Sequence, residues 1–201
     1  MTEVKVLVEG VHEMNADGKM DLGATTTLIK SNINIIVDPG AFVNKDKLLK
    51  ALKDEGLKTT DIQAVILTHT HIDHTTNIFL FPQAIIYNRF IHSNYLGQTH
   101  KIVEGCIERF DIVNEPIADN VKVIETIGHT IDHVSVVVET ELGKIVIAGD
   151  AINGVAMADM NIQADPDFLY SLEEYNKSRE KILAIADYII PGHEAMFKVG
   201  K

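Results

Sequence analysis

In the segment Ala64-Val-Ile-Leu-Thr-His-Thr-His-Ile-Asp-His74, a short apolar run leads directly into three histidines and an aspartate. The apolar part has the length and composition of a buried strand. Because side chains alternate along an extended chain, His69 and His71 should point the same way. Asp73 and His74 follow after the chain must bend, so they can face a second position. The pattern predicts a strand that ends in a cluster of metal-binding side chains.

Three other apolar runs end in comparable residues. A Gly-His pair follows residues 121–127, a Gly-Asp pair follows 144–148, and a Pro-Gly-His triplet follows 188–190. If these strands share one sheet with their ends at one edge, the side chains converge on the place where open α/β sheets bind ligands. Imidazole and carboxylate suit Zn²⁺, Fe²⁺ or Mn²⁺, and the lack of a thiolate argues against a structural cysteine-type zinc centre.

The number of candidate ligands predicts two ions rather than one. A tetrahedral zinc takes four ligands, which is fewer than the sequence offers. The seven candidates are His69, His71, Asp73, His74, His129, Asp150 and His193. The remaining histidines, which we interpret as exposed or hydrogen-bonded residues, are His12, His92, His100 and His133.

Short strands and two helices account for the rest of the pattern. We expect strands at 4–8, 25–29, 33–37, 64–67, 84–87, 121–124, 134–138, 144–147 and 188–190, and helices at 45–55 and 171–186. Ser171 and Glu174 have the spacing of a capping box at the start of the second helix. Residues 12–23 read as a polar loop. Strands and helices alternate only in part, so the pattern leaves α/β and α+β open.

Length and composition limit the class of function. The 201 residues suit one domain, 1–201. Eighteen basic against 29 acidic residues give a net charge of −11, which disfavours a nucleic-acid partner. No apolar run is long enough to span a membrane. The single Cys106 cannot form an internal disulfide, which fits a cytoplasmic location.

Taken in order, the Thr-His-x-His-x-Asp-His, Gly-His-Thr, Gly-Asp and Pro-Gly-His motifs resemble the metallo-β-lactamase superfamily. The match runs from the strand before Asp38 to His193. It implies an αβ/βα four-layer sandwich of mixed sheets flanked by helices, with a dinuclear site at one edge. It also implies a first ion on His69, His71 and His129, a second on Asp73, His74 and His193, and Asp150 between them. Asp38 matches an outer-shell aspartate, and Thr68 and Thr130 flank ligands that they could orient.

Departures from the family patterns narrow this resemblance. The main zinc β-lactamases have a cysteine where this chain has Asp150, which argues against antibiotic hydrolysis. Glyoxalase II relatives add a helical domain, whereas eight residues follow His193 here. Acyl-homoserine lactonases typically have a tyrosine at the position of Asn153. The RNA-processing members with large inserted domains are longer, so a compact hydrolase is expected.

The leading hypothesis is a dinuclear hydrolase whose metal-bridging hydroxide attacks a small ester, thioester or lactone. Two divalent ions, zinc before iron or manganese, are the expected cofactors. Asp73 is the expected catalytic residue, because it could pass a proton to the leaving group. We expect the mobile segments 12–23 and 88–105 to hold the substrate through Met20, His92 and Tyr95. The expected partner is a small-molecule substrate, and the sequence leaves open whether the protein forms a homodimer.

Three alternatives use the same residues differently. A phosphodiesterase or RNA nuclease could use the same ions, with Arg89 and Lys101 supplying positive charge. A non-haem iron oxidoreductase would resemble relatives that bind one iron, which the complete second set of ligands argues against. A non-catalytic metal-binding domain is disfavoured by the intact set of seven.

Overall fold

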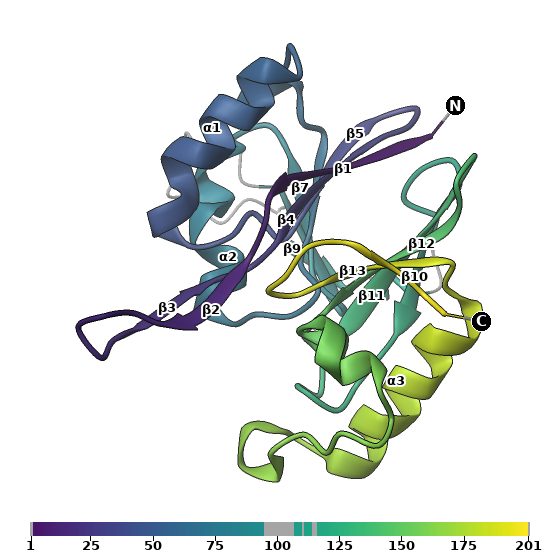
Figure 1. Cartoon of the computed structure of the whole chain (residues 1–201). Helices are drawn as coiled ribbons and strands as arrows, with labels where there is room; N and C mark the ends of the chain where they lie inside the picture. Colours follow the sequence, from purple (N-terminus) through teal and green to yellow (C-terminus); the bar gives the residue numbers. More distant parts are fainter. Residues whose placement is uncertain (1, 95–106, 110, 114–115, 201) are drawn as a thin grey trace.

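Two β-sheets packed face to face form the centre of the molecule, with a helix on each outer side (Figure 1). The structure is a computed structural model that describes residues 2–94, 107–109, 111–113 and 116–200. The layer order is helix, sheet, sheet, helix, so the expected four-layer sandwich is confirmed. Among the described residues, no helix combines the length and apolar character that a bilayer span requires.

The first sheet has seven strands in the order β1-β4-β5-β6-β7-β8-β9. β5, β6 and β7 are parallel to one another, and the other pairs are antiparallel. The bounds are β1 Glu3–Val8, β4 Thr26–Lys30, β5 Asn34–Val37, β6 Ala64–Ile66, β7 Ile85–Tyr87, β8 Ile91–Asn94 and β9 Ile107–Arg109.

The second sheet has five strands in the order β10-β11-β12-β13-β14, with only β12 and β13 parallel. The bounds are β10 Val121–Glu125, β11 Val134–Thr140, β12 Gly143–Gly149, β13 Tyr188–Pro191 and β14 Phe197–Lys198. A separate hairpin of β2 Val11–Met14 and β3 Met20–Gly23 projects from the body of the molecule.

The two-residue period of the strands produces the layers. On β5, Ile35 and Val37 point into the core between the sheets, while Ile36 points outward to the first helix layer. On β11, Val136 faces the same central core and Val137 packs under the opposite helix. These side chains are at most 6% exposed, so both faces of each sheet are covered.

The helices cover the sheets through short apolar stripes. In α1, Lys45–Asp54, Leu48 and Leu52 are buried against the first sheet. In α3, Leu172–Ile185, Ile182 packs on the second sheet and the Ser171 hydroxyl accepts a hydrogen bond from the Glu174 amide. The remaining helices are α2 Ile72–Thr75 and the 3-10 turns Phe42–Asn44, Thr59–Asp61, Thr76–Leu80, Asp150–Ile152, Val155–Ala158 and Pro166–Phe168.

Three points of the sequence analysis need correction. Residues 12–23 are not an irregular loop, because Asn15 closes a tight turn with Asp17 and Lys19 and the flanking residues pair as a hairpin. The four strands that end in candidate ligands do not share one sheet, since β6 lies in the first sheet and β10, β12 and β13 in the second. Of the expected loop 88–105, residues 91–94 form β8 and 95–105 lie outside the described residues.

Gly128 is the place where α3 meets the segment after β10. Its φ is +133°, and a Cβ atom there would overlap the backbone of Tyr175 in α3. The amides of Tyr170 and Ser171 also donate hydrogen bonds to the carbonyls of His129 and Gly128. The start of α3 therefore fixes the backbone of this glycine and of the residue after it.

We predict that Gly128→Ala lowers the free energy of unfolding by about 3 kcal/mol, because backbone atoms cannot move aside cheaply. Gly56→Ala is the matched control, since Gly56 also has a positive φ but a Cβ atom there would meet open space. It should cost only about 1 kcal/mol. Urea denaturation measures both, and equal losses would contradict the close packing of α3 on Gly128.

Candidate metal centre

Seven histidine and aspartate side chains from both sheets meet at one edge of the molecule. They form two groups, and within each the candidate ligand atoms all lie within 4.8 Å of one another. The first group is His69, His71, His129 and Asp150, and the second is Asp73, His74 and His193. The structure thus brings together all seven residues of the sequence pattern.

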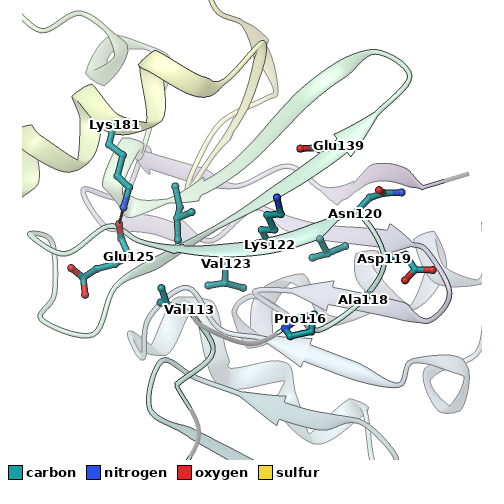
Figure 2. Close-up of a pocket in the computed structure, with 12 residues that line it drawn as sticks. Val113, Pro116, Ala118, Asp119, Asn120, Lys122, Val123, Glu125, Glu139 and Lys181 are labelled. Carbon is teal, nitrogen blue, oxygen red and sulfur yellow. Dashed lines mark hydrogen bonds between the residues drawn. The ribbon is translucent and has the colours of Figure 1, made fainter.

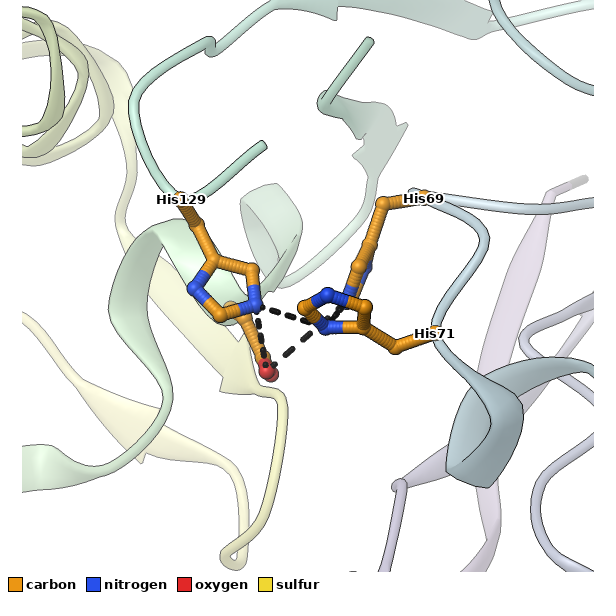
Figure 3. Close-up of side chains that lie close together, drawn as sticks. His69, His71 and His129 are labelled. Atoms are coloured by element: carbon orange, nitrogen blue, oxygen red, sulfur yellow. Dashed lines mark hydrogen bonds and ion pairs between the residues drawn. The ribbon is translucent and has the colours of Figure 1, made fainter. Parts of the chain in front are cut away.

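The first group surrounds His71, which reaches it from the segment after β6 (Figure 3). Nδ1 of His71 lies 3.0 Å from Nε2 of His69 and 3.0 Å from Nε2 of His129. His69 is buried, His129 is half-buried and His71 is exposed. Three ring nitrogens at such short separations suit a shared cation.

Asp150 lies between the two groups and presents one oxygen to each. Its Oδ2 is 3.3 Å from His129 Nε2 and 3.9 Å from His69 Nε2. Its Oδ1 is 3.4 Å from His74 Nε2 and 3.2 Å from His193 Nε2. A carboxylate with this placement can bind two cations at once.

The second group is deeper. Asp73 and His74 come from the short helix α2, where the chain bends after β6, and His193 follows β13. Asp73 Oδ2 is 3.6 Å from the Nε2 atoms of both His74 and His193. All three side chains are buried.

Hydrogen bonds behind the histidines determine which nitrogen faces the centre. The Asp38 carboxylate accepts from the Thr68 amide at 2.8 Å, the Thr68 hydroxyl at 2.7 Å and His74 Nδ1 at 2.8 Å. Because the Thr68 hydroxyl donates to Asp38, its oxygen accepts from His69 Nδ1 at 3.0 Å. His193 Nδ1 donates to the Gly23 carbonyl at 3.1 Å. Each of these three rings thereby turns its Nε2 atom toward the centre.

The charges of the centre are strongly perturbed. Burial lowers the pKa values of His69 and His129, which keeps these imidazoles in the neutral form that binds metals. Burial alone would raise the pKa of Asp150, but His74 and His193 lower it well below its ordinary value. Burial alone would lower the pKa of His74, but Asp150 and Asp38 raise it well above its ordinary value. Asp150 is therefore ionised.

Two buried atoms indicate that the centre fits a cation. His74 Nε2 and Asp150 Oδ1 make no hydrogen bond within the described part of the chain, although they lie 3.4 Å apart. Leaving buried polar atoms without partners is costly. A divalent ion between them would satisfy both atoms, and the imidazole and carboxylate donors match its chemistry.

The other residues that the sequence analysis assigned to the site are not among the two groups of candidate ligands. Thr130 is near His129 in sequence, but its buried hydroxyl has no hydrogen-bond partner among the described residues. Met20 lies on β3 and is 48% exposed. The backbone of His92 belongs to β8. The side chain of His92 and the whole of Tyr95 lie outside the described part of the chain.

His133 is hydrogen-bonded, as the sequence analysis expected, but its position beside the centre was not predicted. His133 is fully buried, stacks on His69 with ring centroids 5.0 Å apart, and accepts a hydrogen bond from the Asp150 amide at 3.1 Å. Burial, followed by the neighbouring His129, lowers the pKa of His133 to about 3. The only sequence signal was its position four residues after His129.

A separate cavity of about 730 Å³ lies along the edge strand β10 (Figure 2). Val123, Lys122 and Lys181 are among its lining residues, and none of the seven candidate ligands is. Lys181 Nζ donates to the Glu125 carbonyl at 2.8 Å beside it. This cavity is therefore separate from the histidine and aspartate centre.

We predict that Asp38→Asn lowers the free energy of unfolding of the metal-free protein by about 1–3 kcal/mol, because an amide group would face donors. Asp38 is 2% exposed and accepts three hydrogen bonds there. Asp17→Asn removes the same charge from the exposed turn of the β2–β3 hairpin and should leave stability nearly unchanged. Urea denaturation in chelator compares them, and an unaffected Asp38→Asn would contradict the importance of these bonds.

Comparison with known proteins agrees with this geometry. Metallo-β-lactamase domain-containing protein 1 of Rattus norvegicus is 35% identical over 190 residues, covering 92% of this chain and 70% of that protein. The Xenopus laevis protein of the same name is 31% identical over 204 residues, covering 98% and 82%.

Solved structures share the fold. A Thermotoga maritima protein assigned to the metallo-β-lactamases has a TM-score of 0.74 at 22% identity, covering 98% of this chain and 99% of that one. A dizinc quorum-quenching lactonase has a TM-score of 0.63 at 18% identity, covering 96% and 90%. The family model described as the metallo-β-lactamase superfamily matches residues 21–193. With its histidine and aspartate side chains positioned to bind metal, this chain belongs to the metallo-β-lactamase superfamily and is a hydrolase of that superfamily.

Proposed function

We propose that the protein is a dinuclear metal-dependent hydrolase of a small ester, thioester or lactone. The placement of Asp150 carries the proposal, because its two oxygens face two separate groups of ligands. His69, His71 and His129 would hold the first ion. Asp73, His74 and His193 would hold the second. The five imidazoles and two carboxylates, with no thiolate, suit zinc, iron or manganese. Zinc is the ion we propose.

The residues divide the chemical work. Two bound divalent ions would supply an activated water near neutral pH and polarise the substrate carbonyl. Asp73 directs Oδ2 toward His74 and His193. We assign its other carboxylate oxygen, Oδ1, to passing a proton to the leaving oxygen or sulfur. Asp38 and Thr68 keep the ligand rings oriented from behind.

The charge distribution supports a small substrate. The net charge of −11 opposes a polyanion. Arg89, one of two cations that could have served a nucleic acid, forms an ion pair with Glu125, and only 11% of its side chain is exposed. Lys101 lies outside the described residues. These observations favour an uncharged ester, thioester or lactone over the phosphodiester or RNA alternative.

The β2–β3 hairpin is the segment we propose to cover the substrate. Its last residue, Gly23, accepts the hydrogen bond from His193, and the His12 ring centroid is 5.6 Å from that of His193. Met14 and Met20 are 64% and 48% exposed on this hairpin. Flexible methionine side chains on a hairpin whose base contacts His193 suit contact with an acyl group.

The test of the proposed function is turnover by the metal-loaded protein on matched substrates. A panel of p-nitrophenyl esters, acyl thioesters and lactones is compared with bis(p-nitrophenyl) phosphate. We expect the carboxylic substrates to be hydrolysed with the higher kcat/KM. Preference for the phosphodiester would replace the substrate class, whereas no hydrolysis of any substrate by a fully loaded protein would count against the hydrolase itself.

We predict that the protein purified without chelator contains about two transition-metal ions per chain, because the seven ligands divide between two positions.

We also predict that Asp150→Ala and His71→Ala lose turnover while keeping the fold. Acidification should release the ions, since ligating imidazoles must be neutral. Elemental analysis and circular dichroism give the readouts. Wild-type turnover by a metal-loaded Asp150→Ala variant would refute the shared position of Asp150.

We predict that Met20→Ala changes KM or kcat for a confirmed substrate without changing metal content, because Met20 lies on the hairpin that we propose to cover the substrate and is not one of the candidate ligands. Leu142→Ala is the control, since Leu142 is 66% exposed at the β11–β12 turn. Steady-state kinetics and elemental analysis compare the two variants. Wild-type constants for Met20→Ala would remove the hairpin from the mechanism. His92 and Tyr95 remain proposed substrate contacts.

A further inference from the structure

A buried chain of hydrogen bonds runs behind Asp150 and contains none of the seven candidate ligands. It consists of His133, Thr126 and Ser135, each 0% exposed. His133 Nε2 accepts from the Asp150 amide at 3.1 Å, and His133 Nδ1 lies 2.9 Å from the Thr126 hydroxyl. The Thr126 and Ser135 hydroxyls are 2.8 Å apart, and Ser135 donates to the Ala148 carbonyl at 3.0 Å.

One donor sets the direction of the whole chain. The Asp150 amide can only donate, so His133 Nε2 must offer its lone pair and Nδ1 of the neutral ring must carry the hydrogen. The Thr126 oxygen then accepts from Nδ1, its hydroxyl donates to Ser135, and Ser135 donates to Ala148. Every hydrogen has an acceptor, and no buried group in the chain is left without a partner.

The two ends of this chain lie on either side of Gly149. The Ala148 carbonyl and the Asp150 amide flank the glycine, whose φ is +52° and ψ −145°. A Cβ atom at this position would lie 2.6 Å from the Thr68 hydroxyl oxygen and 3.0 Å from His133 Nε2. A small rotation about Gly149 would swing the Asp150 carboxylate away from both groups of histidines. The backbone that aims Asp150 is thus held at both ends by one set of bonds.

We infer that His133, Thr126 and Ser135 are positioning residues that fix the Gly149 turn and thereby direct each oxygen of Asp150 toward its own metal position. His133 is not a ligand itself, because both of its ring nitrogens are already used. The inference rests on the proposed dinuclear function. It makes the affinity for the pair of ions depend on a threonine whose hydroxyl bonds to His133 and Ser135 and not to any of the seven candidate ligands.

Thr126→Val is the decisive variant, because it keeps the shape of the side chain and removes the hydroxyl that accepts from His133. Thr126→Ser restores the hydroxyl. Thr27→Val is the matched control, since Thr27 on β4 is equally buried and its hydroxyl has no hydrogen-bond partner among the described residues. If Thr126→Val does not fold, Ser135→Ala breaks the same chain one bond further away.

The measurement is Co²⁺ binding to the full-length metal-free proteins in competition with a chelator, together with the visible absorption spectrum and the melting temperature. We expect Thr126→Val to bind the ion pair about 10- to 100-fold more weakly with an altered spectrum. Thr126→Ser should bind the ions within about threefold of the wild-type affinity, because its hydroxyl can again accept the hydrogen bond from His133. Thr27→Val should change neither affinity nor spectrum.

Different results separate this inference from the proposed function. A wild-type protein that binds only one Co²⁺ overturns the dinuclear proposal, and the inference with it. Two ions on the wild type, with unchanged affinity and spectrum in Thr126→Val, overturn the inference alone. A lowered melting temperature of Thr126→Val without any change in cobalt binding also overturns it, because the chain would then be purely structural.

Discussion

The two sheets pack against each other through β-branched side chains, and this packing positions every other part of the molecule. Valine and isoleucine on the inner faces, such as Ile35 and Val136, hold the sheets together and bring their strand ends to a common edge. Three of the strand ends that carry candidate ligands belong to the second sheet and one to the first. The centre therefore exists only where the two halves of the molecule meet, and its geometry is as rigid as that packing.

The centre concentrates polar groups that would be costly to bury singly. Asp38 and Asp150 are surrounded by donors and imidazoles, so their negative charges are compensated. The partners behind the ligand rings are of three kinds: a neighbour in sequence, Thr68 behind His69; a backbone carbonyl, that of Gly23 behind His193; and a carboxylate distant in sequence, Asp38 behind His74. The same device recurs at His133, where the backbone of Asp150 rather than a ring is held.

Much of this arrangement was predictable because its signals are local. Apolar runs followed by glycine and histidine mark strand ends, and Ser171 with Glu174 marks the start of α3. The hairpin at 12–23 was missed because its charged side chains obscured the Asp17-Gly18 turn signal. The division of strands between sheets depends on pairing across long separations, which no local pattern encodes. His133 was missed because its partners Thr126 and Ser135 are unremarkable until the fold brings them together.

The origin of the ligands in both sheets has a consequence for biosynthesis. His69 leaves the ribosome long before His193, so a nascent chain holds only a partial and solvent-exposed set of imidazoles for much of its synthesis. Such a partial set binds metal weakly and with little discrimination. The correct ion would then have to be selected after the second sheet has docked, when the ligands synthesised last complete the set. Metal availability in the cell would thus act on an already assembled protein rather than guide its assembly.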